Sequence, residues 1–296
     1  MKNLLSKNHN ASCYINIVIR TVAHLEYPVT GSENFEKMFI DHGLLNLQPE
    51  PLDPESILEE VQLLENSKDN STEKNNQYNE LLKIFKEYDF GWYSFLRVQF
   101  VDDDVVRAMK DSGCRGVYLG IESSVDKILL NMNKKARRKD FYKGISLLNK
   151  YDIDYVAAFV LGFPGETEET IIENIKFIEE LKIKYYALKE FYYMENTMIH
   201  ANREKFGLTG MGSRWSHNTM SYSQATEYKL RMFLSINNSV HVDPDTSLWH
   251  LAHLHDLGFT RNEVLEYQME INQLIKNDLL EFSTTRKLDY NLAQVL

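Results

Sequence analysis

The chain has 296 residues, of which 43% are hydrophobic, and a formal net charge of -10 at pH 7. This size and composition suit one large α/β domain with a helical appendage, or two smaller domains. The negative charge argues against a broad electrostatic grip on nucleic acid or anionic lipid, because both need clustered Lys and Arg. No apolar run reaches the roughly 18 residues of a membrane span, so no membrane partner is expected.

The cysteine content is low, with only Cys13 and Cys114 in the sequence. Two cysteines make no disulfide framework, and a reducing cytoplasm is the expected location. Residues 1–22 contain a short apolar patch without the apolar length or the small-residue cleavage site of a signal peptide. The protein is therefore expected to be cytoplasmic.

The first ninety residues have the least regular pattern. Pro51 and Pro54 break the preceding segment, and Asp53 suits the N-cap of a new helix. The expected elements, in chain order, are a strand at 14–22, a helix at 55–64, a polar surface loop or disordered insertion at 65–76 and a helix at 78–88.

From Gly91 onwards, strands and helices alternate. Strands are expected at 91–100, 115–123, 154–162 and 184–193, and helices at 101–113, 125–133, 139–151 and 167–182. Thr167 suits the N-cap of the last helix, whose buried stripe is predicted to be Ile171, Ile175, Ile178 and Leu181. This alternation predicts right-handed βαβ units on a parallel sheet, either open or rolled into a barrel.

The alternation ends near Met194. A Gly-rich connector and three helices, expected at 223–238, 247–257 and 260–280, make up the rest. The predicted organisation is a poorly defined segment at 1–50, a partial barrel at 51–193 and a C-terminal helical subdomain at 194–296.

Two strands end in glycine-containing turns, LGIES at 119–123 and LGFPGET at 161–167. Parallel sheets and barrels bind ligands at the carboxyl ends of their strands. Period-two alternation puts Tyr118, Gly120 and Glu122 on one face, so Glu122 is a candidate acceptor for a ligand amine or ribose hydroxyl.

The second turn offers a small surface to the same ligand. Ala158, Val160 and Gly162 share a face, and Gly162 and Gly165 allow close approach to a flat molecule. The alternative is a barrel lined by small residues with tight turns, in which Glu166 only lies near the positive end of the next helix.

The stretch from 113 to 181, with both turns, resembles the second half of the radical S-adenosylmethionine (radical SAM) core domain. The resemblance is to cobalamin-dependent members and, with 90–114, REKFGLTG and RWSHNTM, to the phosphinate P-methyltransferase-like branch. It covers about two thirds of the chain. It implies an α/β fold, a partial parallel (β/α) barrel of radical SAM type that is TIM-barrel-like, with a C-terminal helical subdomain.

The resemblance also implies roles for individual residues. Arg97 is expected near the SAM carboxylate, and Glu122 and Ser123 near the ribose and the amino acid portion. Val160, Gly162 and Gly165 are expected to flank the adenine. The cofactors implied are S-adenosylmethionine (SAM), a 4Fe-4S iron-sulfur cluster and cobalamin.

One feature departs from the family. Radical SAM chemistry uses three cysteines spaced CxxxCxxC on a 4Fe-4S cluster, and counting from Cys13 the other two positions hold Ile17 and Arg20. The expected function is therefore a radical SAM-like protein that retains the SAM-binding half of the barrel and is non-catalytic by itself. The alternatives are an active methyltransferase-like subunit whose cluster is completed by another chain, and a protein that binds SAM or a related nucleotide without a cluster.

Other candidate sites and partners remain open. His250, His253 and Asp256 could bind a metal or lie on a partly exposed helix. Trp215 and His217 could face a substrate or pack in a loop, and the basic run at 133–140 could meet an anionic substrate or lie in solvent. The expected partners are a small-molecule or peptide substrate, a partner chain supplying the cluster half, and a second copy bound at an open barrel edge.

Overall fold

The computed structural model describes residues 79, 81–88, 91–98, 101–243 and 247–285. The strand predicted at 14–22, the helix at 55–64 and the loop at 65–76 lie outside these residues. Contacts divide the chain into two units, and both glycine turns belong to the second unit, which comprises Phe95–Gln99, Gly116–Lys150 and Asp154–Leu296. No helix in the described ranges combines the length and the hydropathy needed to cross a bilayer.

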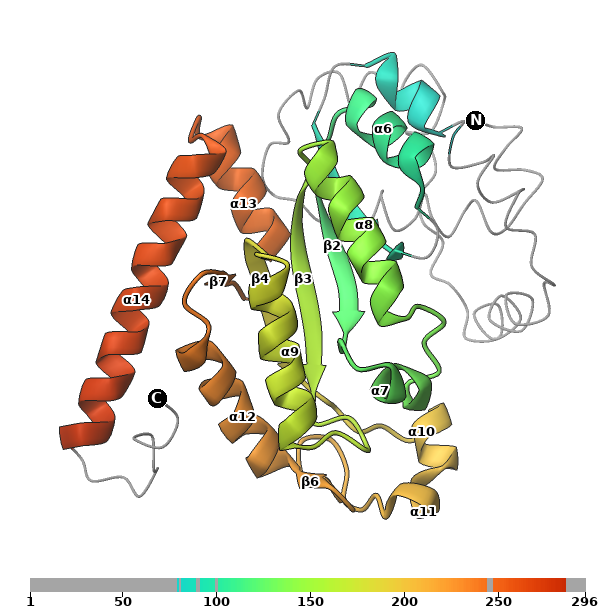
Figure 1. Cartoon of the computed structure of the whole chain (residues 1–296), viewed down its shortest axis with the longest axis vertical. Coiled ribbons are helices and arrows are strands. Elements are labelled where there is room, and N and C mark those ends of the chain that lie inside the picture. Colours follow the sequence, from blue (N-terminus) through green and yellow to red (C-terminus); the bar gives the residue numbers. More distant parts are fainter. Residues whose placement is uncertain (1–78, 80, 89–90, 99–100, 244–246, 286–296) are drawn as a thin grey trace, which may run out of the picture. The chain divides into compact units, whose positions relative to one another are not determined.

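The centre of the fold is a five-stranded sheet in the order β1-β2-β3-β4-β7 (Figure 1). Its strands are β1 (Trp92–Leu96), β2 (Cys114–Glu122), β3 (Asp154–Leu161), β4 (Tyr185–Glu190) and β7 (Val240–His241). The pairs β2–β3, β3–β4 and β4–β7 are parallel. The predicted α/β class with a parallel sheet is confirmed, and the sheet of the described residues is open, not a closed barrel.

The predicted helices between the strands are also present. They are α6 (Asp103–Asp111), α7 (Asp126–Asn131), α8 (Arg138–Lys150) and α9 (Glu168–Glu180). The Asp102 carboxylate caps α6 by accepting the Val105 N–H at 2.9 Å. Gly113, with φ of 93°, ends that helix in the left-handed conformation that glycine adopts freely.

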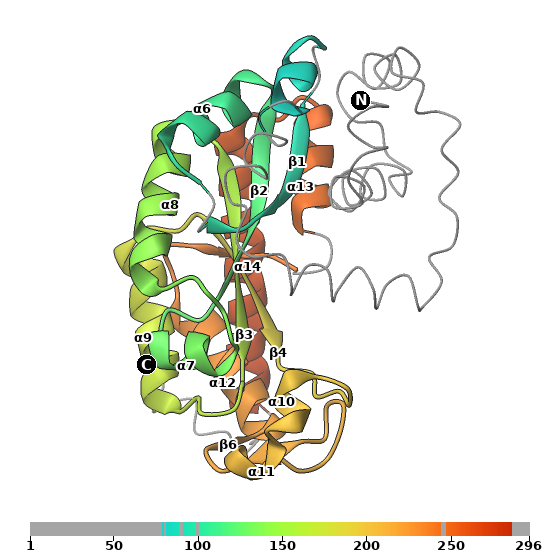
Figure 2. The same ribbon diagram turned by 90° about the vertical axis from the view of Figure 1, so that its right-hand side faces the viewer.

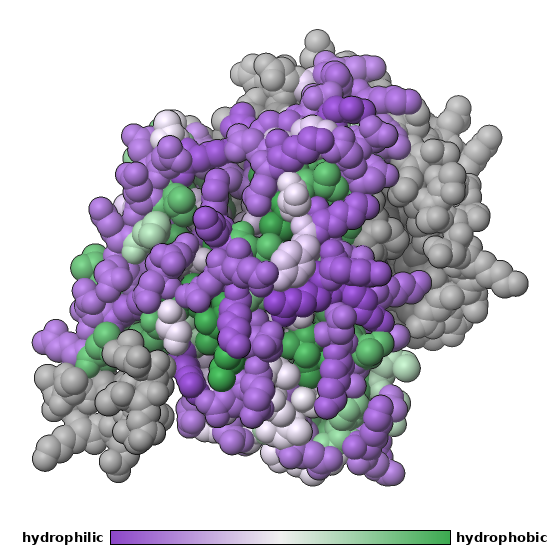
Figure 3. Space-filling model, viewed as in Figure 1, coloured by the Kyte–Doolittle hydropathy of each residue, from purple (hydrophilic) through white to green (hydrophobic). Residues whose placement is uncertain are grey.

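Helices α8 and α9 cover one face of the sheet (Figure 2). Phe159 of β3 meets Phe177 of α9 with ring centroids 6.4 Å apart, and Phe141 of α8 meets the same ring at 6.5 Å. Because side chains alternate along a strand, Tyr118 and Gly120 point to the opposite face. The side of the helices away from the sheet is mainly hydrophilic (Figure 3), as expected for helices with one buried stripe.

The stripe predicted for α9 is partly wrong. Ile171 and Ile178 are buried, but Ile175 and Leu181 are only half-buried. Asn174 and Phe177 take the remaining buried positions. Hydrophobicity alone predicts that Ile175 is buried in preference to its polar neighbour. Asn174 is nevertheless wholly buried, because its side chain hydrogen-bonds to polar groups beneath the helix.

The C-terminal part contains the three predicted helices and five further short elements. The helices are α12 (Tyr222–Ser235), α13 (Ser247–Asp256) and α14 (Arg261–Thr285). The short elements are α10 (Met198–Ala201), α11 (Arg203–Phe206), β5 (Ser216–His217), β6 (Met220–Ser221) and β7. Strands of two residues are too short to show alternation, so no pattern in the sequence predicts them.

The outer edge of β7 is covered by a side chain. On the inner side, Val240 N–H donates to Lys184 O at 2.8 Å. On the outer side, the His241 N–H donates to Asn272 Oδ1 at 2.7 Å, and Asn272 Nδ2 donates to His241 O at 3.0 Å. The Asn272 amide of α14 therefore occupies the hydrogen-bonding positions that a further strand would use at the β7 edge. Self-association through a sheet edge stays a prediction, and it concerns the opposite edge, at β1.

Candidate functional site

The two glycine turns lie next to each other at the carboxyl ends of β2 and β3. We call residues 122–125 the first turn and residues 162–167 the second turn. In Figure 1 both strands point towards the end of the sheet where α7 and α10 lie. This is the end at which parallel sheets bind their ligands.

Three small residues are aligned across the sheet on the face opposite α8 and α9. Gly120 pairs with Ala158 on β3, and Ala158 pairs with Ala187 on β4. We call these residues the small-residue row. Larger side chains, among them Tyr118 and Tyr185, occupy the next row towards the start of the strands. Ala158 and Ala187 are buried, and Gly120 is half-buried, so a ligand can approach the backbone most closely at the Gly120 end of the row.

Glu122 lies at the end of β2 in an unusual backbone conformation. Its φ is 63°, a left-handed value that costs a non-glycine residue about 1–2 kcal/mol, and the strand register shifts between Gly120 and Glu122. A Cβ placed on Gly120 would lie 2.7 Å from Glu122 Oε1. The carboxylate therefore lies beside Gly120, where any larger residue would displace it.

The Glu122 carboxylate is paired with Lys134. Lys134 Nζ donates to Glu122 Oε1 at 3.1 Å, and the two side chains are 21% and 30% exposed, respectively. The pair is therefore within reach of a ligand. Lys134 belongs to the basic run at 133–140, and composition alone did not single it out from its neighbours.

Both glycines of the second turn are required by the packing of the chain itself. Gly162 has φ of 80°, and its Cβ would lie 2.4 Å from Trp215 Cη2. Gly165 has φ of 99°, and its Cβ would lie 2.5 Å from Asn131 Nδ2. These contacts explain the two glycines without a ligand, and ligand contact at either remains a prediction.

Glu166 fastens the second turn from inside. Its side chain is wholly buried; Oε2 accepts the Gly162 N–H, and Oε1 accepts Asn174 Nδ2 at 3.3 Å. Burial raises the pKa of Glu166 to about 8, and hydrogen bonds from Gly162, Asn174 and Phe163 oppose that rise. Glu166 is thus a structural carboxyl and does more than lie near the start of α9.

Trp215 and His217 hold the same turn from the other side. His217 Nδ1 accepts the Thr219 N–H at 3.3 Å, so its proton lies on Nε2, which donates to Gly162 O at 3.0 Å. Burial lowers the pKa of His217, which keeps the ring neutral. Trp215 stacks on this ring at 5.2 Å, and both residues are almost fully buried. Of the two alternatives for this pair, loop packing is the one present.

The other residues suggested by the resemblance have different surroundings. Ser123 is wholly buried, and its Oγ accepts the Val125 N–H at 3.2 Å, so the hydroxyl stabilises its own turn. Val160 is half-buried on the same face as the small-residue row. Arg97 is exposed and directly follows β1, the neighbour of β2 in the sheet. Glu122 and Val160 therefore share one accessible surface, whereas Ser123 does not reach it.

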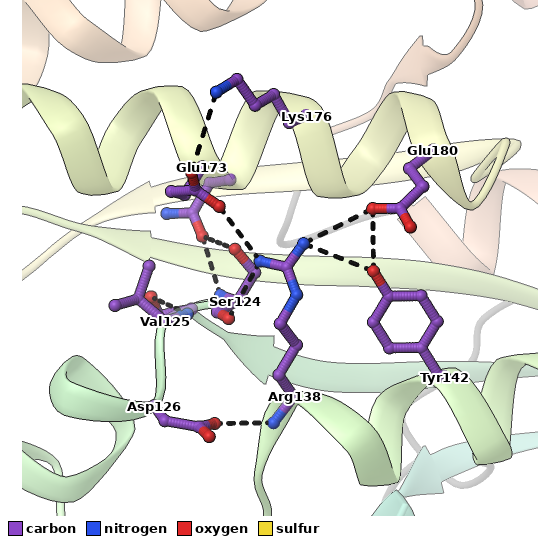
Figure 4. Close-up of polar contacts among 10 residues, drawn as sticks. Ser124, Val125, Asp126, Arg138, Tyr142, Glu173, Lys176 and Glu180 are labelled. Carbon is purple, nitrogen blue, oxygen red and sulfur yellow. Dashed lines mark hydrogen bonds and ion pairs between the residues drawn. The ribbon is translucent and has the colours of Figure 1, made fainter.

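An arginine joins the first turn to α8 and α9 (Figure 4). Arg138 Nη1 lies 3.5 Å from Ser124 O and 3.4 Å from Glu173 Oε2, and Nη2 lies 3.5 Å from Glu180 Oε2. The Tyr142 hydroxyl donates to the same Glu180 oxygen at 2.8 Å. The sequence suggested either an anionic substrate or solvent as the surroundings of this basic run, whereas Arg138 contacts the first turn and two carboxylates of α9.

The described residues do not fit an iron-sulfur cluster. Cys114 is buried at the start of β2, whereas Glu122 ends that strand. No group of three or more His, Cys, Asp or Glu side chains within the described ranges is placed to hold a metal ion. The accessible chemistry at the carboxyl edge is a carboxylate and an ammonium group beside the half-buried Gly120 and Val160, which suits a ligand with hydroxyl groups and an acid group.

Comparison with known proteins gives this region a superfamily. The model of the radical SAM superfamily matches residues 50–178, which include both turns. The matched segment is less than half of the chain and carries β1 to β3 and most of α9. Over these residues the chain is similar to the radical SAM domain, as the two motifs indicated, and the finer P-methyltransferase-like branch stays a prediction.

A methyltransferase and a tRNA-modifying synthase are among the proteins similar to this chain. The chain is 34% identical over 105 residues to an uncharacterized methyltransferase of Pyrococcus horikoshii, covering 35% of this chain and 23% of that protein. It is 32% identical over 114 residues to a tRNA-2-methylthio-N(6)-dimethylallyladenosine synthase of a Sulfurihydrogenibium species, covering 35% and 25%. The chain spans about a quarter of the length of these relatives. The activity of the full-length relatives therefore does not transfer directly to this chain.

Solved structures resemble the chain more distantly. The methyltransferase TsrM of Kitasatospora setae, with cobalamin and a 4Fe-4S cluster bound, is 16% identical with a TM-score of 0.36, covering 40% of this chain and 23% of that one. Elp3 of Methanocaldococcus infernus is 15% identical with a TM-score of 0.44, covering 55% and 38%.

Proposed function

We propose that this chain binds SAM, or a closely related nucleoside, at the carboxyl edge of its sheet, and that its 296 residues do not assemble a 4Fe-4S cluster by themselves. The observation that carries the proposal is the accessible Glu122–Lys134 pair beside the small-residue row. The match of residues 50–178 to the radical SAM superfamily supports SAM as the ligand class.

The chemistry of the pair sets requirements on the ligand. An ionised Glu122 accepts hydrogen bonds and suits the two ribose hydroxyls. Hydroxyls that bind Glu122 Oε1 compete with Lys134 Nζ for this atom, and the ammonium group has further N–H donors for an anionic group of the same ligand. SAM carries both a ribose and a carboxylate, and its adenine is flat enough to lie against the half-buried Val160. A nucleoside without an acid group meets only the first requirement.

The pair gives a prediction with two directions. Glu122→Gln should weaken SAM binding about 10-fold or more, since a hydrogen bond to a charged group contributes about 1.5–3 kcal/mol. Lys134→Ala should weaken SAM binding similarly but leave 5′-deoxyadenosine binding equal or tighter, because it removes a competitor for Glu122. Isothermal titration calorimetry of both ligands measures these effects.

Two exposed charged residues outside the pair provide controls for these variants. Lys135→Ala and Glu227→Gln remove charges of the same type from exposed positions, and both should bind SAM as the unmodified chain does. Absence of any SAM binding by the unmodified protein would overturn the proposal. If Lys134→Ala weakened the binding of SAM and of 5′-deoxyadenosine equally, Lys134 would not be the partner of the ligand's acid group.

The proposal also predicts the outcome of cluster reconstitution. Under anaerobic conditions with iron and sulfide, the chain alone should not gain the roughly four irons of a 4Fe-4S cluster, because such clusters take three or four cysteine thiolates and the sequence has two cysteines. Iron and sulfide analysis with visible absorption measures this. About four irons per chain that disappear in Cys13→Ala would contradict the expectation.

A second candidate function follows from the relatives. The named relatives are a methyltransferase and a methylthiotransferase-type synthase, and the SAM-side turns are retained here. The chain could then be one part of a methyltransferase-like enzyme whose cluster is completed by a partner chain with a CxxxCxxC segment. Reconstitution that succeeds only when such a partner is mixed with this chain distinguishes this function from a non-catalytic binding protein.

A further inference from the structure

Asn174 lies in the middle of α9, and neither the sequence pattern nor the resemblance assigns it a role. Its side chain is completely buried. Its Oδ1 accepts both the Ser124 N–H at 2.7 Å and the Ser124 hydroxyl at 2.8 Å. Its Nδ2 donates to Glu166 Oε1 at 3.3 Å. One amide therefore bonds to the first turn with its oxygen and to the second turn with its nitrogen.

The two ends of this bridge are themselves buried. Ser124 and Glu166 are both fully inaccessible to solvent. A buried polar group without a partner costs about 1–3 kcal/mol, so Ser124 and Glu166 both depend on the Asn174 amide between them.

The bridge continues from Glu166 to the backbone of the second turn. Glu166 Oε2 accepts the Gly162 N–H, and His217 Nε2 donates to Gly162 O. On the other side of Asn174, Arg138 reaches Ser124 O and pairs with Glu173. The line from Arg138 to His217 therefore passes through both turns, and Asn174 is its central link.

We propose that Asn174 is a positioning residue that couples the first and second turns, so that the two sides of the candidate site hold one ligand as a unit. The bridge of Ser124, Asn174 and Glu166 carries this proposal. Its ligand side rests on the proposed function, but the coupling of the turns exists without any ligand. The two parts are therefore tested separately.

The ligand-free test uses Glu166 as an internal probe. Between pH 7 and 10, ionisation of Glu166 should shift the amide resonances of Gly162 and Ser124 with one common midpoint near 8. His217 faces the same glycine but remains neutral in this range, because burial lowers its pKa from 6.5. In Asn174→Leu, Gly162 should still follow the titration and Ser124 should no longer follow it.

Two further variants keep this test decisive. Asn174→Asp retains the size of the side chain and places a second carboxyl beside Glu166, which should raise the midpoint seen at Gly162. Asn272→Leu removes another buried amide with two hydrogen bonds, at the β7 edge, and should leave the common midpoint intact. A Ser124 resonance that follows Glu166 equally well in Asn174→Leu, or an unchanged midpoint in Asn174→Asp, would overturn the coupling.

The ligand test compares a whole ligand with a fragment. SAM is proposed to contact Glu122 of the first turn and, through its adenine, Val160 at the end of β3 that leads into the second turn, whereas free adenine contacts only the Val160 side. Asn174→Leu should weaken SAM binding at least about 10-fold, equivalent to about 1.4 kcal/mol, and change adenine binding less than about 2-fold, while Asn272→Leu changes neither. Equal losses for SAM and adenine would overturn the positioning role. If the unmodified chain binds no SAM, the proposed function fails, and the resonance titration still decides the coupling.

Discussion

Gly162→Ala should lower the free energy of unfolding by about 3 kcal/mol or more. Two costs add at this position. The φ of 80° costs an alanine about 1–2 kcal/mol, and the new Cβ would lie 2.4 Å from Trp215 Cη2 and 2.7 Å from Ala225 Cβ. Overpacking of this kind costs about 1–3 kcal/mol. Urea unfolding followed by circular dichroism measures the loss.

A second glycine separates the two costs. Gly258 also has a positive φ, of 93°, but nothing lies within 4 Å of its Cβ position. Gly258→Ala should therefore cost only the backbone term, about 1–2 kcal/mol. If Gly162→Ala costs no more than Gly258→Ala, Trp215 does not fill the space beside the turn. Gly162→Ala should also cost less in a Trp215→Phe background than in the unmodified chain, because the shorter ring no longer reaches that space.

Much of the fold follows from local sequence. Period-two alternation placed Val117, Leu119 and Ile121 together, and all three are buried at 0% exposure. Stop signals such as Gly113 ended helices at the expected places. These features depend on neighbouring residues, which is why a single sequence suffices to predict them.

The support of the site did not follow from local sequence. Asn174 looks like a surface residue among isoleucines, because its partners lie 50 residues earlier, at Ser124, and 8 residues earlier, at Glu166. The β7 edge depends on Asn272, which is 31 residues away. Such side-chain pairings form only after the strands and helices have packed. A buried polar residue at a core position of a helix is the one signal that could have indicated them.

The stability of this chain should depend on pH through Glu166. Its pKa is about 8 in the folded chain against 4.5 as the ordinary value, chiefly because of burial. The folded state therefore retains a proton that the unfolded state has lost between these values. Stability from this group is fully present below about pH 4.5 and declines as pH rises to about 8, by on the order of 5 kcal/mol in total.

Glu166→Gln isolates this effect, because glutamine is neutral at every pH and has nearly the same shape. Near pH 5, where Glu166 carries its proton, the free energy of unfolding of the variant should equal that of the unmodified chain or be slightly lower. As pH rises, the variant should become the more stable of the two, since only the unmodified chain must bury a charge. Urea unfolding at several values from pH 5 to 9 measures this difference in stability, with exposed Glu227→Gln as a control that should show no such trend.

A difference that moves the opposite way would mean that the N–H groups of Gly162, Phe163 and Asn174 stabilise the carboxylate more than burial penalises it. The bridge between the two turns would then be built around a permanent charge instead of a proton.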